Sequence, residues 1–515
     1  MGLDIFYTWL SENEVQVLPG VSISEKDSSI AVFSTKTFDT CEKLAIIPKR
    51  AVLSTRTCAF CEHISWVPYG HGAILALSLA LYSEILRGAQ SRWFGYLQSL
   101  PASIVPIARL WGHPAAFADD ADAQEAYRWL QGTEVQRELQ DDEGMSLLTE
   151  IDEYYESDVE PLLTSHKLGP SLSGFLRAYS LVCSRAFLVD AYHGLSMVPV
   201  ADAFNHEQKN HVQLTSEYDV CPECGSLAEC PHDHEDTPEG VRPEKLTEDG
   251  MDTVDMVAVR PIPAGIEVYN TYGAHLGNAA LLARYGFMLD SFETDRITFG
   301  WPGSGLVVEG SPNQWMEVYE SVKSDVGPVV DVSLSLYQSG GDREEPSLSV
   351  NSDGQASLGM FVWAARNIVA QELSSQYQSG TRAATVGLIT RTFSVLLQVE
   401  VRRRMTDVDA DPITDTDALQ VLVRTADAII HLCRARLARM GQPGDRAVTP
   451  QLLCELLDVL PPEKFKTRYA LEYLLGERAI LEACVANWEE LRNSVGDAST
   501  PGSTSSSGVE VPNCK

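Results

Sequence analysis

The sequence predicts an α+β protein in which a β fold is interrupted by a helical insertion and followed by an all-helical carboxyl-terminal domain. Three observations support this class. Short β-rich runs occupy the first 56 residues, helical periodicity takes over from Gly72, and strand signals return at residues 255–273, before long helical runs begin near residue 305. A chain of 515 residues also exceeds the size that one hydrophobic core usually supports, so more than one domain is expected.

Residues 1–75 are expected to form the amino-terminal part of the β fold. The runs "SIAVFS" (29–34) and "LAIIPKRAVLS" (44–54) are rich in apolar and β-branched residues and lie between turn residues. Residues 76–175 form the expected helical insertion. In this segment "GAILALSLALYSEILRG" repeats apolar residues at helical spacing, and "SRWFGYLQSLP" ends in a proline.

An acidic stretch lies inside the insertion. Residues 119–160 carry fifteen Asp and Glu residues against two Arg, while apolar residues recur between them at helical spacing. This pattern is typical of a solvated acidic helix face. A docking face for a basic substrate is the alternative interpretation.

The second part of the β fold is expected at residues 176–300. A helix in "LSGFLRAYSLVCSRAFLV" leads into "GLSMVPVADAFNH", and strand signals return in "DMVAVRPIPAGIEVYNTYG". A polar insert containing Cys and His separates them at residues 215–253. Residues 305–495 are predicted to be helical apart from a Gly/Ser-rich loop at 338–357, and residues 496–515 form a predicted disordered tail.

The charge balance excludes some functions. The formal net charge is −33 at pH 7, so direct binding to a nucleic-acid backbone is not expected, whereas a basic protein partner is compatible with it. We find no secretory signal and expect no apolar stretch of the roughly 20 residues that a membrane-spanning helix needs. Eleven cysteines without such a signal indicate reduced thiols or metal ligands, so we expect a protein of the cytoplasm, the nucleus or both.

Four short motifs follow one another in the second part of the β fold. They are "SRAF" (184–187), "ADAFNH" (201–206), "TYG" (271–273) and "RYGF" (284–287). Each is weak by itself, but together and in this order they resemble the SET-domain methyltransferases of the Rubisco large-subunit lysine methyltransferase group. The resemblance covers roughly residues 5–300, and only helical content and order match it further along. It implies a SET-domain β fold, with the helical region 305–495 as a substrate-binding domain.

The resemblance also implies roles for particular residues. The Asn-His pair of the family falls on Asn205 and His206, which would bind S-adenosylmethionine, and Arg185 and Asp202 match other positions of that cofactor pocket. Tyr272 matches the catalytic tyrosine, which also borders the cofactor, and Tyr285 matches the second tyrosine, which helps to hold the target amine.

One loop departs from the family pattern. Where a glycine-rich cofactor loop is expected, this chain has Ser28 and Ser29 followed by Ile30. Glycine permits close backbone approach and positive φ, whereas serine still offers main-chain groups. We therefore keep Ser28, Ser29 and Ile30 as cofactor-binding candidates and expect weaker contacts there.

The chemistry implied by the resemblance explains these residue types. Methyl transfer to an amine needs an aligned and neutral acceptor, whereas a free lysine has a pKa of about 10.4. A narrow apolar channel disfavours the ammonium by desolvation. Tyrosines suit its walls because each offers an apolar ring and one directional polar atom. The step itself requires no metal.

The polar insert contains "CPECGSLAECPHDH" (221–234), with Cys221, Cys224, Cys230 and His232 as candidate zinc ligands. A Cys-x-x-Cys-Gly turn supplies half of a tetrahedral site, and Cys230 with His232 could complete it. The gap between the halves is shorter than in common zinc fingers, so a surface loop with unrelated cysteines is the alternative.

The sequence therefore predicts a protein-lysine N-methyltransferase that uses S-adenosylmethionine. We expect a basic protein substrate such as a ribosomal protein, a translation factor or a histone tail, with preference for a non-histone target. Two alternatives remain at this stage. One is a protein-histidine methyltransferase on the same scaffold, and the other is an inactive SET-fold adaptor that binds partners through its helical domain.

Overall fold

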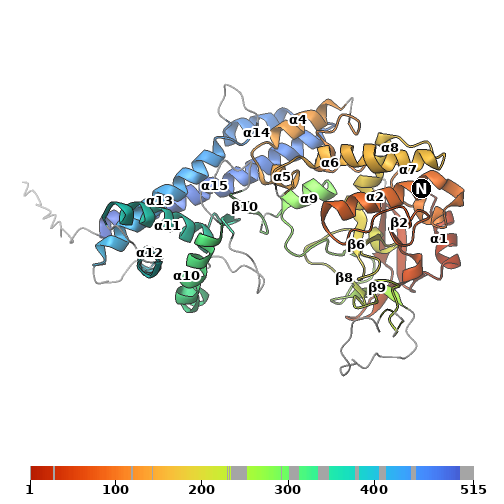
Figure 1. Cartoon of the computed structure of the whole chain (residues 1–515), viewed down its shortest axis with the longest axis horizontal. Coiled ribbons are helices and arrows are strands. Elements are labelled where there is room, and N and C mark those ends of the chain that lie inside the picture. The colour runs from red at the N-terminus through yellow and green to blue at the C-terminus, as the bar shows by residue number, and fades with distance from the viewer. Residues whose placement is uncertain are drawn as a thin grey trace, which may run out of the picture. The chain divides into compact units, whose positions relative to one another are not determined.

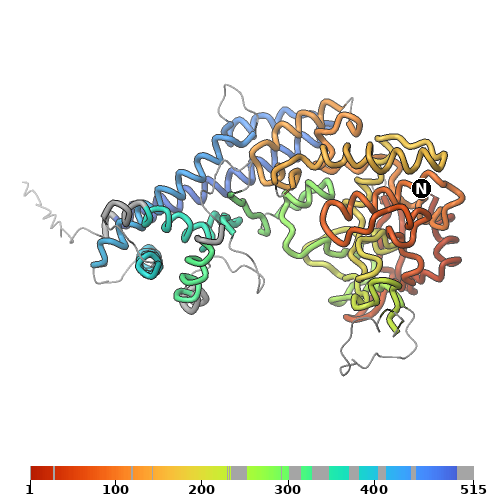
Figure 2. The backbone as a smooth tube through the Cα atoms, in the orientation of Figure 1, coloured from red at the N-terminus to blue at the C-terminus, as the bar shows by residue number. Residues whose placement is uncertain are grey.

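The computed structural model describes most of the chain (Figures 1 and 2). The described residues are 2–26, 29–117, 120–141, 143–228, 230, 232, 252–291, 293–300, 312–333, 347–376, 382–404, 413–441 and 448–498. The chain divides into two compact units. The first comprises Met1–Tyr127, Glu138–Asp141 and Met145–Met288, and the second Arg128–Arg137, Asp142–Gly144 and Leu289–Lys515.

Among the described residues of the first unit, the strands form three small antiparallel sheets. Their strand orders are β1-β4-β9-β8, β2-β3 and β5-β7-β6. The strands are β1 (Gln16–Val17), β2 (Val21–Lys26), β3 (Ser29–Ser34), β4 (Lys43–Pro48), β5 (Leu53–Ser54), β6 (Ala186–Leu188), β7 (Leu195–Met197), β8 (Val212–Ser216) and β9 (Thr253–Ala258). Because β4 pairs with β9 and β5 with β7, the long segment between them is looped out of the β fold, as the sequence predicts for a helical insertion.

The helices of this unit follow the predicted periodicity. They are α1 (Leu3–Glu12), α2 (Gly70–Arg87), α3 (Phe94–Leu97), α4 (Ala121–Trp129, which crosses the unit boundary), α6 (Leu147–Tyr154), α7 (Glu160–Ser165), α8 (Leu172–Arg185) and α9 (Asn278–Tyr285). The Oγ of Ser171 accepts a hydrogen bond from Gly174 N–H and caps α8, and Gly88 ends α2 at φ +53°.

Helix α1 was not predicted, because the first 56 residues were assigned only β-rich runs. Phe6, Trp9 and Leu10 are buried at helical spacing. The indole N–H of Trp9 donates to the carbonyl of Arg92 at 2.6 Å, and a Cβ added at Gly95 would lie 2.3 Å from the Trp9 Cβ. The helix is thus stabilised by close packing on α3, a contact that local sequence does not reveal.

Lys49 joins both ends of the polar insert. Its Nζ donates to the carbonyl of Glu217 at 2.9 Å and lies 2.8 Å from carboxylate oxygens of Asp190 and of Asp252. The Lys49 side chain is only 3% exposed. Burial opposes ionisation of Asp190, but hydrogen bonds from His193 and Lys49 outweigh it and hold the pKa of Asp190 well below its usual range.

The part of the second unit that the structure describes contains helices and one two-stranded sheet. Its helices are α5 (Glu134–Glu138), α10 (Pro312–Ser333), α11 (Leu358–Gln376), α12 (Arg382–Arg404), α13 (Thr416–Leu437), α14 (Pro450–Val459) and α15 (Phe465–Ala498). Strand β10 (Arg296–Thr298) pairs with β11 (Ser349–Asn351). The prediction of a loop at 338–357 is therefore wrong for β11. The sequence around β11 did not reveal this strand, because its pairing partner β10 lies some fifty residues away. Helix α15 extends to Ala498, and residues 499–515 of the predicted tail lie outside the described residues.

A buried charge cluster ties residues 128–137 to the carboxyl-terminal helices of this second unit. The guanidinium of Arg436, whose side chain is 0% exposed, lies 3.5 Å from Glu134 and 3.3 Å from Glu477. Glu134 also accepts hydrogen bonds from Thr298, and its N–H donates to Glu477 at 2.8 Å. Burial raises the pKa of Glu477 to about 7, although Arg436 opposes that shift.

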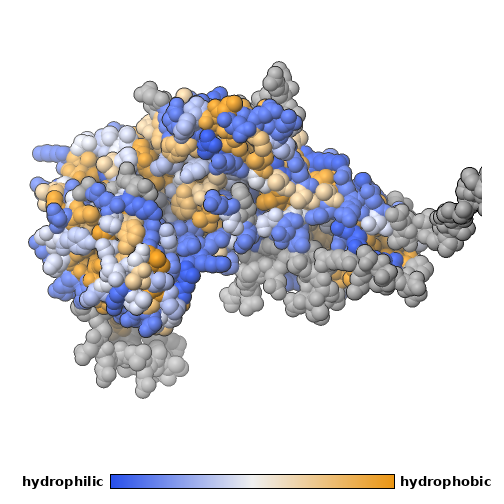
Figure 3. All heavy atoms as spheres, turned by 180° about the vertical axis from the view of Figure 1, so that it is seen from behind, coloured by the Kyte–Doolittle hydropathy of each residue, from blue (hydrophilic) through white to orange (hydrophobic). Residues whose placement is uncertain are grey.

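Two described helices, Gly70–Gln90 and Arg382–Arg403, are long and apolar enough to cross a bilayer by length and composition. Our expectation that no such stretch exists is wrong on that criterion. The first packs inside its own unit, where Leu77, Ala80 and Leu81 are fully enclosed, and a core helix meets the same criterion. On the face drawn in Figure 3, hydrophobic side chains are interspersed among hydrophilic ones.

Replacing Lys49 by Met should lower the free energy of unfolding by about 3–5 kcal/mol, because the Asp190 carboxylate would stay buried without its cation. Arg50→Met is the matched control. Arg50 pairs with Glu14 at the surface, with the two side chains 57% and 60% exposed, and its loss should cost at most about 1 kcal/mol. Chemical denaturation followed by circular dichroism measures both variants, and equal losses would contradict the role of Lys49.

Candidate functional site

Main-chain hydrogen bonds join the two segments that carry the Asn-His and Tyr-Gly motifs. Asn270 N–H donates to the Asn205 carbonyl at 2.8 Å, and Glu207 N–H donates to the Asn270 carbonyl at 3.0 Å, so His206 forms a parallel bridge with Asn270. Just upstream, Val200 adopts φ +73°, a strained conformation for a β-branched residue, before a 3₁₀ turn at Ala201–Ala203. The two motifs, more than sixty residues apart, thus meet at one place.

The imidazole of His206 is held in one tautomer. Tyr272 N–H donates to Nδ1 at 3.0 Å, and burial lowers the pKa of His206, so the neutral ring carries its proton on Nε2. That Nε2 is buried and no described residue accepts its hydrogen bond. In the parallel bridge the main-chain N–H and C=O of His206 also face away from Asn270, and among the described residues none bonds them. His206 therefore offers two donors and one acceptor to a bound molecule.

Three aromatic rings gather beside His206. The rings of Tyr272 and Tyr285 stack with centroids 4.6 Å apart, and Phe287 lies 5.9 Å from His206 and 6.3 Å from both tyrosines. Gly286, in the left-handed conformation at φ +80°, ends α9 between Tyr285 and Phe287. Burial is the main cause of the raised pKa of both Tyr272 and Tyr285, so both phenols stay protonated at neutral pH.

Arg185 connects the amino-terminal strands to the Asn-His segment. Its guanidinium donates to Ser29 Oγ at 2.6 Å and to the Asp202 carbonyl at 2.7 Å, and it lies 3.7 Å from the Asp202 carboxylate. That carboxylate is fully enclosed and accepts a hydrogen bond from Tyr96 at 2.9 Å. Burial raises the pKa of Asp202, while Arg185 opposes the shift. Arg185 Nε and Asp202 Oδ1 are buried without a described hydrogen-bond partner.

The predicted serine loop is only partly described. Ser28 lies outside the described residues, Ser29 begins β3 and contacts Arg185, and Ile30 is a core residue with 1% exposure.

The side chain of Asn205 points to a residue that the sequence analysis missed. Its amide donates to Glu267 at 2.7 Å, and the same carboxylate pairs with Lys26 at 2.6 Å and accepts from the Tyr269 hydroxyl at 2.9 Å. Burial opposes ionisation of Glu267, but these three donors lower its pKa. In the sequence, Glu267 lies just before the Asn-Thr-Tyr-Gly turn, and Lys26 lies just before the serine loop. This proximity to two predicted motifs is the signal that could have identified both residues.

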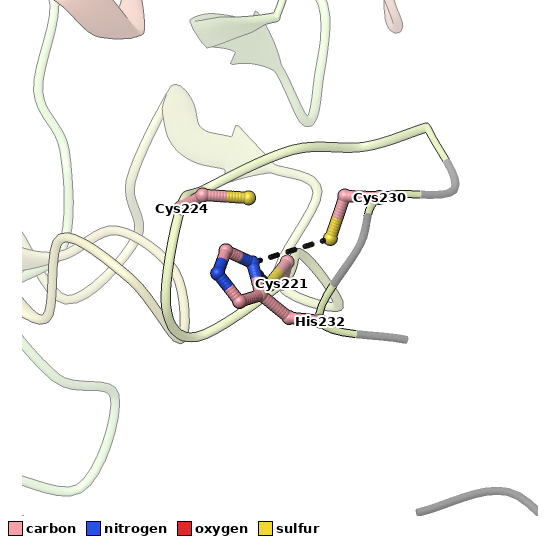
Figure 4. Close-up of side chains that lie close together, drawn as sticks. All are labelled: Cys221, Cys224, Cys230 and His232. Carbon is pink, nitrogen blue, oxygen red and sulfur yellow. Dashed lines mark hydrogen bonds between the residues drawn. The ribbon is translucent and has the colours of Figure 1, made fainter. Parts of the chain in front are cut away.

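The candidate zinc ligands also come together. Figure 4 shows the side chains of Cys221, Cys224, Cys230 and His232 converging, and their ligand atoms all lie within 4.8 Å of one another. We call these four residues the Cys/His cluster. Hydrogen bonds from the main-chain N–H groups of Cys224, chiefly, and of Glu223 lower the pKa of Cys221 to about 7. His234 lies outside the described residues.

Several curated proteins that resemble this chain in sequence are named as lysine methyltransferases. No protein-family model matches the chain. It is 28% identical to ribosomal lysine N-methyltransferase 3 of Saccharomyces cerevisiae over 172 residues, covering 25% of this chain and 31% of that protein. It is 27% identical to N-lysine methyltransferase SETD6 of Bos taurus over 311 residues, covering 55% of this chain and 56% of that protein. The chain thus spans about half the length, or less, of the curated relatives it matches.

The solved structures that resemble the chain cover nearly all of it. The SET domain of LSMT bound to lysine and AdoHcy matches with a TM-score of 0.58 and 17% identity over 96% of this chain and 92% of that one. Rubisco LSMT bound to AdoMet matches with a TM-score of 0.55 and 16% identity, covering 96% and 93%. The chain therefore has the fold of these SET-domain structures. Its fold is that of the Rubisco LSMT structures, which confirms the family resemblance and the fold class read from the sequence.

Because burial raises the pKa of Tyr272, this phenol should not ionise where ordinary tyrosines do. Up to about pH 10, an ultraviolet titration of the folded wild type and of Tyr272→Phe should therefore count the same number of tyrosinates. The unfolded proteins are the control and should differ by one tyrosine. A one-tyrosine difference between the folded proteins below that pH would contradict the protonated state.

Proposed function

We propose that the chain is a protein-lysine N-methyltransferase that uses S-adenosylmethionine. The observation that carries the proposal is the meeting of His206, Tyr272 and Tyr285 around the 205–207/270 main-chain pairing. It combines two donors and an acceptor on His206, none of them bonded by a described residue, with a stacked tyrosine pair. The likeness to named lysine methyltransferases supports the same conclusion.

The residues fit this cofactor. A molecule carrying both hydrogen-bond donors and acceptors, as an adenine and an amino acid do, would satisfy the main chain and the Nε2 of His206. The buried Nε of Arg185 has no hydrogen-bond partner among the described residues, and the Asn205 amide is held by Glu267. S-adenosylmethionine, when bound, supplies a methyl group on a cationic sulfur.

The chain's own part in the transfer is to hold a neutral amine in line. The rings of Tyr272 and Tyr285 wall the site, and their desolvating surroundings favour the uncharged form of a lysine whose free pKa is about 10.4. The Tyr272 hydroxyl donates to the Phe204 carbonyl at 3.3 Å, which leaves its oxygen lone pairs free to accept a hydrogen bond from an amine. Because this phenol keeps its proton, it orients the amine and does not act as a phenolate base; the amine proton leaves to solvent before transfer.

We further propose that the substrate is a basic protein, with a ribosomal protein or translation factor favoured over a histone tail. The chain would act on it in the cytoplasm, the nucleus or both. The net charge of −33 supports a basic partner. A pocket of about 330 Å³ beside α2 and α6 is lined by both apolar and acidic residues. Its lining includes Leu75, Leu79, Glu150, Glu153 and Asp158. An apolar stem with a cationic head, as in Lys or Arg, suits such a lining.

Calorimetry should show that the wild type binds S-adenosylmethionine and that Asn205→Ala loses this binding, because the Asn205 side chain positions the segment beside His206. Tyr272→Phe should still bind, since the ring stack persists, but should transfer labelled methyl groups about 10²–10³-fold more slowly. Tyr69→Phe, which alters only an exposed hydroxyl bonded to Tyr218, is the control for both measurements.

The same assay separates the alternatives. Labelled methyl groups on lysine after hydrolysis of a methylated ribosomal-protein pool support the proposal, whereas label on histidine supports the histidine-methylating alternative. A folded wild type that binds no S-adenosylmethionine at millimolar concentration would overturn the enzyme proposal and favour the adaptor.

Charge reversal at the pocket should weaken substrate docking without changing the transfer step. We expect Glu153→Lys combined with Asp158→Lys to raise KM for a basic protein several-fold at unchanged kcat, with the difference shrinking above about 0.15 M salt. Glu156→Lys is the matched control, because Glu156 is exposed on the same segment but does not line the pocket. Equal KM values for the double variant and this control would contradict docking at the pocket.

A further inference from the structure

The Cys/His cluster has the composition and spacing of a tetrahedral metal site. With Zn–S bonds of about 2.3 Å and Zn–N bonds of about 2.05 Å, tetrahedral geometry requires S···N separations of about 3.6 Å and S···S separations of about 3.8 Å. His232 Nδ1 lies 3.7 Å from the sulfur of Cys221 and 3.6 Å from that of Cys230. All ligand atoms of the cluster lie within 4.8 Å of one another.

The main chain around Cys221 holds the first two ligands in a tight turn. Gly225 N–H donates to the Cys221 carbonyl at 2.7 Å, and Cys221 N–H donates to the Ser226 carbonyl at 3.0 Å. Gly225 adopts φ +72°, and a Cβ added there would lie 2.9 Å from the Tyr192 ring. This Cys-x-x-Cys-Gly turn therefore requires glycine for both its conformation and its packing.

We propose that the Cys/His cluster binds one structural Zn²⁺ ion. Three thiolates and one imidazole form a common donor set for zinc, and four protein ligands leave no open position for a substrate. On binding, three thiols release their protons to solvent and four coordinate bonds form, with no change in oxidation state. The inference does not rest on the proposed methyl transfer, because the cluster lies on the connection between β8 and β9.

The ion would link two short segments of the polar insert to the body of the first unit. Gly225, which directly follows residues 221–224, lies close against the Tyr192 ring. The Ala191 N–H donates to the Tyr218 carbonyl at 3.2 Å. Ala191 and Tyr192 lie in the loop 189–194, which also carries Asp190, the partner of Lys49. Zinc would therefore hold the start of the insert against the loop 189–194. Lys49 already joins this loop to both ends of the insert.

The test begins with the full chain, purified under reducing conditions without chelators or metal-affinity columns. Mass spectrometry of elements should find about one zinc per chain. Cys221→Ser and Cys224→Ser should each lose most of it. Cys61→Ser and Cys454→Ser are matched controls, because both cysteines are exposed and lie outside the cluster, and they should keep the metal.

A second measurement covers variants that fail to fold. Wild type stripped of metal under reducing conditions should take up Co²⁺ and show thiolate-to-cobalt charge transfer with the intense visible bands of a tetrahedral site. Added Zn²⁺ should remove these bands. A folded, reduced wild type that contains no zinc and binds neither Zn²⁺ nor Co²⁺ would overturn the proposal, as would zinc retained in both Cys221→Ser and Cys224→Ser.

Methyl-transfer assays keep this result separate from the proposed function. Zinc in a chain that does not bind S-adenosylmethionine would leave the metal site standing and overturn only the enzyme proposal. S-adenosylmethionine binding in a chain without zinc would do the reverse.

Discussion

The candidate site depends on the main-chain pairing of residues 205–207 with Asn270. Each of its two hydrogen bonds contributes only about 1 kcal/mol net, so the pairing does not hold the two segments together unaided. Most of the stabilisation must come from the enclosed side chains around it, since Val200, Phe204 and Val268 are all 0% exposed. Hydrophobic burial thus provides the energy, and the two hydrogen bonds set the register that brings Tyr272 to His206.

Buried charges position the chain at further points within the units. Lys49 with Asp190 and Arg185 with Asp202 do so in the first unit, and Arg436 with Glu477 does so in the second. Burial opposes ionisation of all three acids, but the outcome differs. The pKa of Asp190 is lowered because His193 and Lys49 both donate to it, whereas the pKa of Asp202 and of Glu477 is raised because desolvation outweighs their partners. Such pairs add little net stability and are best understood as fixing the arrangement of the segments they join.

The proposed methyl transfer makes two demands on the site, and different groups would meet them. The main chain and the Nε2 of His206, which have no hydrogen-bond partner among the described residues, would provide polar recognition. The stacked rings of Tyr272 and Tyr285 would provide an apolar wall. Keeping Tyr272 protonated follows from the same burial that would favour a neutral amine. Exclusion of water would therefore keep both the Tyr272 phenol and the acceptor amine uncharged. The Cys/His cluster has no share in this chemistry and belongs to the framework of the polar insert.

The sequence by itself determined the fold class, the looped-out helical insertion and the identity of the motifs, because periodicity and short motifs are local properties of the chain. It also identified all four members of the Cys/His cluster. Only the tertiary structure decided that Glu267 contacts both Asn205 and Lys26, that Asp202 is enclosed with Tyr96, and that Ser349–Asn351 forms a strand. These contacts join residues that are tens to more than two hundred positions apart. Their formation depends on which surfaces are buried together, and no local pattern encodes that.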